Sequence, residues 1–198
     1  MRSALTVCLL FASMALGQNN CSPNDFKKLF TLSNQATVSD PAFTAGLKIF
    51  KKLEAGKCYD YTTKNAKRQD SVIASRTEIF GDICLKANSR RAIKEYIAYL
   101  NRHTGSAEEQ LSFSFERLFV QQPADVLSVI GTDKRLLGHL VWGFVNNHYN
   151  AGPDNSKLNS KNYSAIFYRV NPHIKQLYPK YKIQIDYLLS AIKSELKG

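Results

Sequence analysis

The sequence predicts an all-α protein, a compact multi-helix bundle of about eight helices packed antiparallel to one another. Three observations support this prediction. Apolar residues recur at the three- and four-residue spacing of amphipathic helices through most of the chain. Pro, Ser, Asp and Gly stand where these segments begin and end, and no stretch shows convincing strand alternation. The connections are mostly short, which favours antiparallel neighbours; a short α-solenoid of helix pairs is the alternative arrangement.

Residues 1–17 are predicted to be a signal peptide that is cleaved from the rest of the chain. Arg2 precedes an apolar run that is too short to anchor the protein stably in a bilayer. Small residues before Gln18 favour cleavage at that point. We therefore expect export to the periplasm or the exterior, with residues 18–198 forming a single all-α domain.

The first half of this domain is predicted to hold four helices and one long polar loop. Ser22-Pro23 and Asp40-Pro41 are typical helix starts, because proline costs no hydrogen bond in the first turn. Gly56 is expected to end the second helix. The predicted segments are helices over about 23–34, 40–55, 70–85 and 89–103, with a polar loop over 57–69.

Three consecutive helices are predicted between residues 106 and 148. Ser106 begins a capping box, S-x-x-E, ahead of an apolar run. A second, short helix is expected from Pro123 to Gly131, and Thr132 or Asp133 is expected to cap the third. The residues expected to face the core are Leu111, Phe115, Leu118, Phe119, Val126, Leu127, Ile130, Leu136, Leu137, Leu140, Val141, Phe144 and Val145.

The C-terminal part is predicted to be a breaker-rich loop followed by interrupted helices. The loop over 149–161 contains Gly152-Pro153, and a helix carrying Tyr163 and Ile166 follows it. Asn171-Pro172 and then Pro179 are expected to interrupt the helical pattern. The last helix is amphipathic and basic, which would suit either packing on the bundle or contact with an anionic membrane surface.

The chain carries a formal net charge of +11, which favours a polar or acidic partner. Such a partner would be a polar or acidic polymer or another exported protein; a nucleic acid is not the expected partner. The excess of Lys and Arg is not concentrated in a run of like charges, so a generally basic surface without a specific partner is the alternative interpretation. No stretch after the leader has the length and apolarity of a transmembrane segment.

Removal of the leader would leave three cysteines, Cys21, Cys58 and Cys84. Export permits disulfides. We expect a bridge between Cys58 and Cys84, because the ends of two successive helices can come together there. The alternative is that all three remain thiols, with Cys84 as a core residue.

Three polar or aromatic residues of the third predicted helix are the candidate ligand-binding site. His139, Trp142 and Asn146 follow the spacing i, i+3 and i+7 and share one helix face near a long loop. An aromatic platform with polar groups to orient a ligand is typical of a binding rim. The alternative is that Trp142 only packs and His139 is solvated or hydrogen-bonded.

Gly138 and Gly143 also lie inside this predicted helix. A glycine there costs up to about 1 kcal/mol relative to alanine. Close approach of a neighbouring helix at both positions would compensate for that cost.

No catalytic apparatus is recognisable, and neither a cofactor nor a metal site is predicted. The four histidines lack the short spacing of a local metal motif, and neither Cys58 nor Cys84 has a second ligand nearby in the sequence. The leading hypothesis is an exported helical binding protein of unknown ligand. The alternatives are a helical hydrolase of cell-envelope polymers, with Glu78 and Asp82 as a carboxylate pair, and a peripheral membrane-surface protein.

Overall fold

The computed structural model describes residues 22–58, 60–64, 71–103, 108–149 and 157–197. The predicted leader, Cys21 and Ser106 lie outside the described residues. The described part contains nine helices and one two-stranded hairpin. The helices are α2 (Pro23–Ser33), α3 (Asp40–Ala55), α4 (Arg76–Ala87), α5 (Arg90–Arg102), α6 (Glu108–Gln121), α7 (Pro123–Ile130), α8 (Lys134–Asn147), α9 (Tyr163–Val170) and α10 (Ile174–Glu195).

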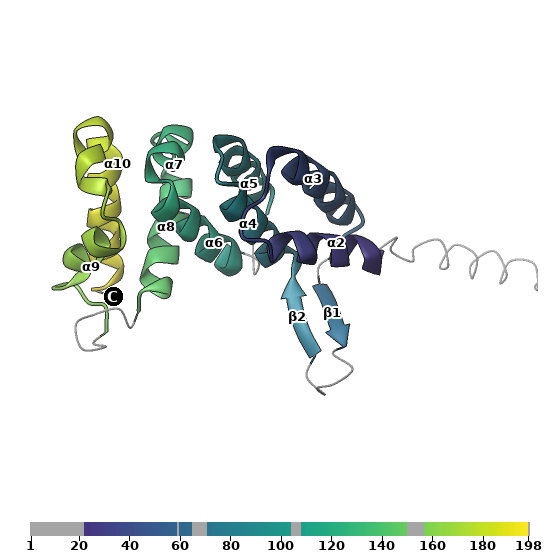
Figure 1. Ribbon diagram of the computed structural model, residues 1–198. Helices are drawn as coiled ribbons and strands as arrows, with labels where there is room; N and C mark the ends of the chain where they lie inside the picture. Colours follow the sequence, from purple (N-terminus) through teal and green to yellow (C-terminus); the bar gives the residue numbers. More distant parts are fainter. Residues whose placement is uncertain (1–21, 59, 65–70, 104–107, 150–156, 198) are drawn as a thin grey trace, which may run out of the picture.

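The predicted fold class, an all-α multi-helix bundle, is confirmed. The helices follow one another in chain order across the molecule, so that α2 and α3 form one end and α9 and α10 the other (Figure 1). The helices α2, α4, α6, α8 and α10 each pack on the next of this set. The bundle is therefore layered along the chain, as the alternative of stacked helix pairs also predicts.

The three helices predicted between residues 106 and 148 are present as α6, α7 and α8. Pro123 lies in the first turn of α7, and Gly131 follows its last residue. Asp133 caps α8, since its side chain accepts hydrogen bonds from the backbone N–H groups of Arg135 and Leu136. All the residues expected to face the core are buried except Val145, which packs half-buried against it.

The segment predicted as a polar loop and the start of a helix is instead a hairpin. Strand β1 (Asp60–Lys64) pairs antiparallel with β2 (Ser71–Ser75), and α4 begins directly afterwards at Arg76. The expected helix start at about residue 70 is therefore wrong. The strands contain the β-branched pairs Thr62-Thr63 and Val72-Ile73, which favour extended backbone over helix.

The last two helices are separated as predicted, but Pro179 bends the chain without ending its helix. Helix α9 ends before Asn171-Pro172. Helix α10 continues through Pro179 with a kink at Tyr181, whose φ is −120° and ψ is 30°. A proline inside a helix removes one backbone hydrogen bond and kinks the helix. Here both halves of α10 continue as helix on either side of the kink.

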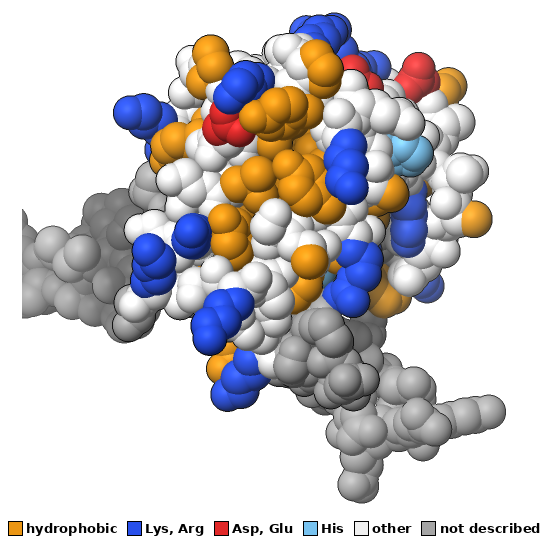
Figure 2. Space-filling model, turned by 90° about the vertical axis from the view of Figure 1, so that its left-hand side faces the viewer, with side chains coloured by type: hydrophobic (Ala, Val, Ile, Leu, Met, Phe, Trp, Pro, Cys, Tyr) orange, Lys and Arg blue, Asp and Glu red, His pale blue; other side chains and the backbone are white. Residues whose placement is uncertain are grey.

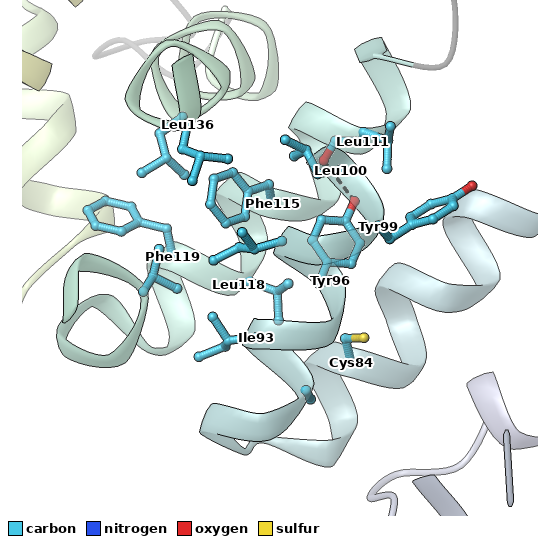
Figure 3. Close-up of a cluster of buried hydrophobic side chains, with 14 of the residues drawn as sticks. Cys84, Ile93, Tyr96, Tyr99, Leu100, Leu111, Phe115, Leu118, Phe119 and Leu136 are labelled. Carbon is cyan, nitrogen blue, oxygen red and sulfur yellow. Dashed lines mark hydrogen bonds between the residues drawn. The ribbon is translucent and has the colours of Figure 1, made fainter. Parts of the chain in front are cut away.

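The apolar stripes of successive helices meet in a continuous core that is rich in aromatic rings. Figure 3 shows the central part, where the Tyr96 hydroxyl donates a hydrogen bond of 2.8 Å to the backbone oxygen of Leu111. This bond satisfies the one polar atom that Tyr96 takes into the core. Phe50 and Phe80 stack with their ring centroids 3.9 Å apart, joining α3 to α4.

The predicted bridge between Cys58 and Cys84 is wrong. Cys84 is a free thiol buried inside α4, and burial raises the pKa of that thiol. Cys58 is disulfide-bonded, but not to Cys84. The helix carrying Cys84 begins only after the hairpin, and the helical register then turns this side chain into the core.

Candidate binding surfaces

Helix α8 carries the three predicted site residues, and its neighbours separate them. His139 points to α6, where its Nδ1 lies 2.8 Å from the Oγ of buried Ser112. The Asn146 side chain is exposed and donates back to the backbone oxygen of Trp142 at 2.9 Å. Sharing a helix face therefore does not bring these side chains to one ligand site.

Trp142 lines a groove that lies between α8 and α10. The groove has a volume of about 460 Å³. Its lining combines small and aromatic side chains: Gly138, Val141, Trp142, Tyr187, Ser190, Ala191, Ser194 and Glu195. The half-buried Trp142 ring also packs against the ring of Phe113 on α6, with the two ring centroids 5.2 Å apart. Trp142 thus lies at the wall of a groove, and its role in binding a ligand stays a prediction.

A buried carboxyl group, which the sequence analysis did not single out, lies at the far end of the α6–α8 contact. The Glu116 side chain is 3% exposed. His148 Nε2 lies 2.9 Å from one carboxyl oxygen, and Asn147 Nδ2 donates to the other at 2.8 Å. Both oxygens are engaged inside the protein, so Glu116 holds the end of α8 against α6.

The candidate catalytic pair lies at a polar hollow formed by α2, α4 and α6. Glu78 and Asp82 line this hollow of about 480 Å³ together with Arg117. Arg117 donates to the Asp82 carboxylate at 2.9 Å. The Asp82 carboxylate is thus already engaged by a cation on α6. Glu78 is exposed. This arrangement gives no support to the hydrolase hypothesis.

The end of the bundle formed by α9 and α10 carries a cluster that we call the tyrosine–lysine face. It consists of Tyr163 and Tyr168 on α9 with Lys175, Tyr178, Lys182 and Asp186 on α10. Lys175 lies 5.4 Å from the centroid of the Tyr168 ring, and Lys182 lies at the same distance from the Tyr178 ring. The Tyr178 hydroxyl donates to Asp186 at 2.8 Å.

The titration of this face follows from the same contacts. Partial burial, with Tyr178 and Asp186 nearby, raises the pKa of Tyr168. The hydrogen bond between the Lys182 ammonium and the Asp186 carboxylate lowers the pKa of Asp186 and raises the pKa of Lys182. Tyr168 is therefore neutral and Lys182 charged around neutral pH.

The C-terminal segment that carries this face is strongly basic. Between residues 157 and 197 there are eight Lys and Arg but only two acidic residues. Figure 2 shows this end of the molecule, with hydrophobic side chains at its centre and Lys and Arg around them. Half of the ten tyrosines also lie in this segment, a signal in the sequence that could have pointed to the face.

Among the described residues, no three His, Cys, Asp or Glu side chains gather as a metal site would require. In the same part of the chain, no helix combines the length and apolarity needed to cross a membrane.

Comparisons of the chain with protein-family models, with curated proteins and with solved structures find no match.

Proposed function

We propose that this protein is an exported binding protein that holds an acidic polymer on its tyrosine–lysine face. The observation that carries the proposal is the placing of lysines beside partly buried tyrosines on two helices at one end of the bundle. The lysines supply positive charge, and the rings supply rigid apolar surface for the less polar parts of a partner.

Charge distribution supports an acidic partner over a neutral one. The excess of eight basic over two acidic residues in one segment gives a local positive field that attracts anions. Asp186 offsets the charge of Lys182, with which it pairs, so Lys175 and the other basic residues of the segment provide the excess. A polymer gains from several such contacts at once, whereas a small anion meets only one or two of them.

The disulfide of Cys58 supports the export part of the proposal, because disulfides persist mainly in oxidising compartments. If the leader is removed before Gln18, the exported protein should begin at that residue, which mass spectrometry of the N-terminal peptide would measure. Cys21 would then be the one cysteine besides Cys58 and Cys84. An unreduced peptide map should join Cys58 to Cys21; recovery of the intact leader would contradict export.

The binding experiment uses heparin as an acidic polysaccharide, polyglutamate as an acidic polypeptide, and vesicles with and without anionic lipid. We expect tight, salt-sensitive binding to at least one of the two polymers, since salt screens exposed charges. The double variant Lys175→Glu/Lys182→Glu, which reverses the charge of both lysines of the face, should weaken this binding about tenfold or more. Binding to anionic vesicles alone would favour the membrane-surface alternative.

A matched control reverses two charges elsewhere on the molecule. Lys48 on α3 and Lys94 on α5 are exposed and lie outside α9 and α10. Lys48→Glu/Lys94→Glu changes the net charge by the same amount. If both double variants lose affinity equally, the polymer responds to overall charge and the proposed face is wrong.

A further inference from the structure

The end of the bundle formed by α2 and α3 carries a groove with one apolar wall and one positively charged wall. It lies between α2 and α3 and has a volume of about 530 Å³, within the range of small-molecule sites. Its lining residues are Asn24, Lys27, Lys28, Leu29, Thr31, Leu32, Gln35, Ala42, Ala45, Gly46 and Ile49. We propose that this α2–α3 groove binds an anionic amphiphile, a molecule with one extended hydrocarbon chain and a negatively charged head.

The wall supplied by α3 is apolar and made mainly of small residues. Ala42, Ala45, Gly46 and Ile49 follow the spacing of one helical stripe, so they line the groove along its length. At the floor, Leu29 is buried and Leu32 is half-buried. An added Cβ on Gly46 would meet Leu32 Cδ2 at 2.6 Å. The small side chains above this contact leave room for a hydrocarbon chain.

The wall supplied by α2 is polar and positively charged. Asn24, Lys27, Lys28 and Thr31 line the groove from this helix, Gln35 lines it just after the helix ends, and all five are exposed. Among the described residues, none that lines the groove is acidic, and neither lysine is in an ion pair. The positive charge at this edge is therefore available to a ligand.

The two walls together select the class of ligand. A purely apolar molecule would leave the lysine edge without a partner, and a small hydrophilic anion would leave the alanine and isoleucine wall in contact with water. An amphiphile with a negative head satisfies both, because its chain covers the α3 wall while its head lies beside Lys27 and Lys28. This inference is independent of the tyrosine–lysine face, which lies at the opposite end of the molecule.

The test titrates the purified protein with dodecanoate below its micelle concentration and follows binding by calorimetry. Dodecanoate should bind more tightly than dodecanol, and dodecyltrimethylammonium should bind most weakly. Decanoate should bind about tenfold more weakly than dodecanoate, because each buried methylene contributes a several-fold factor to affinity. If dodecanoate does not bind, or if the three head groups bind equally, the proposal is wrong.

Two variants locate the binding. Ala45→Trp fills the groove from an exposed position of α3 and should abolish binding. Lys27→Glu/Lys28→Glu should weaken dodecanoate binding about tenfold while changing dodecanol binding little. Lys48→Glu, exposed on α3 but outside the groove, is the control and should bind as the parent does.

The variants also distinguish other occupants. Circular dichroism establishes that each variant is folded. If Ala45→Trp binds dodecanoate as the parent does, the ligand lies elsewhere and the proposal fails. If the parent protein self-associates in sedimentation and Ala45→Trp makes it monomeric without any dodecanoate binding by the parent, the groove holds a second copy of the chain instead.

Discussion

Helix α8 has one side that is closely packed and one that is open, and each side contains a glycine. Toward α6, an added Cβ on Gly143 would lie 2.4 Å from the backbone oxygen of Ser112. Toward α10, Gly138 has no neighbour within 4 Å of such a Cβ and lines the Trp142 groove. The same residue type thus allows close helix contact at one position and leaves space at the other.

The difference separates stability from binding on a single helix. The α6–α8 contact also contains the Ser112–His139 and Glu116–His148 pairs, so the polar side chains there bind one another. The α8–α10 side keeps a half-buried indole at a groove wall. Substitutions toward α6 should therefore change the free energy of unfolding, whereas substitutions toward α10 should change it little.

The largest effect is expected at Glu116. Glu116→Ala removes a buried carboxyl group, so that His148 loses this partner and Asn147 keeps only its longer bond of 3.3 Å to the backbone oxygen of Phe113. Loss of hydrogen bonds to a carboxyl group costs about 1.5–3 kcal/mol, so the free energy of unfolding should fall by about 3 kcal/mol. Urea unfolding followed by circular dichroism measures it. Glu116→Gln, which keeps an acceptor oxygen, should lose less; equal losses would show that the acceptor is unimportant.

Gly143→Ala should give the next largest loss. The new methyl group would meet backbone atoms of Ser112, which cannot move aside as a flexible side chain can. Overpacking of this kind costs about 1–3 kcal/mol, even though alanine is the better helix former. Thermal and urea unfolding should both show the loss. An unchanged or raised stability would mean that α6 and α8 lie farther apart than the structure places them.

The sequence alone predicted this close contact only in part. Periodicity and capping identified α6, α7 and α8, because their signals are local to each helix. The expectation of close helix approach is met at Gly143 and wrong at Gly138, since the distance to a neighbouring helix depends on tertiary packing. The hairpin was missed because its two strands, which contain Thr62-Thr63 and Val72-Ile73, are too short to show a clear alternation of apolar and polar residues.

The candidate site was less predictable than the fold for the same reason. Trp142 was found because it is the only tryptophan and lies near a loop. The tyrosine–lysine face was missed because Tyr168 and Tyr178 belong to different helices, and the turn at Asn171-Pro172 has to return the chain before they meet. The α2–α3 groove likewise depends on how two stripes from separate helices face each other.

His139→Ala should have a smaller effect, on the closely packed side. The change leaves the hydroxyl of Ser112, which is buried, without the partner that lies 2.8 Å from it. A lost hydrogen bond of this kind costs about 1 kcal/mol. The double variant Ser112→Ala/His139→Ala should recover part of that loss in urea unfolding, because no buried hydroxyl then remains unsatisfied. If the two single losses simply add, the pair does not interact.

Gly138→Ala should have the smallest effect, and one of opposite sign. Its Cβ enters open space, so the gain in helix propensity of up to about 1 kcal/mol is not opposed by a clash. The free energy of unfolding should rise slightly, while Gly143→Ala, measured in parallel, lowers it. Because Gly138 lines the Trp142 groove, the fluorescence of the single tryptophan should also report any change there. A loss of stability like that of Gly143→Ala would mean that both sides of α8 are closely packed, and the comparison would fail.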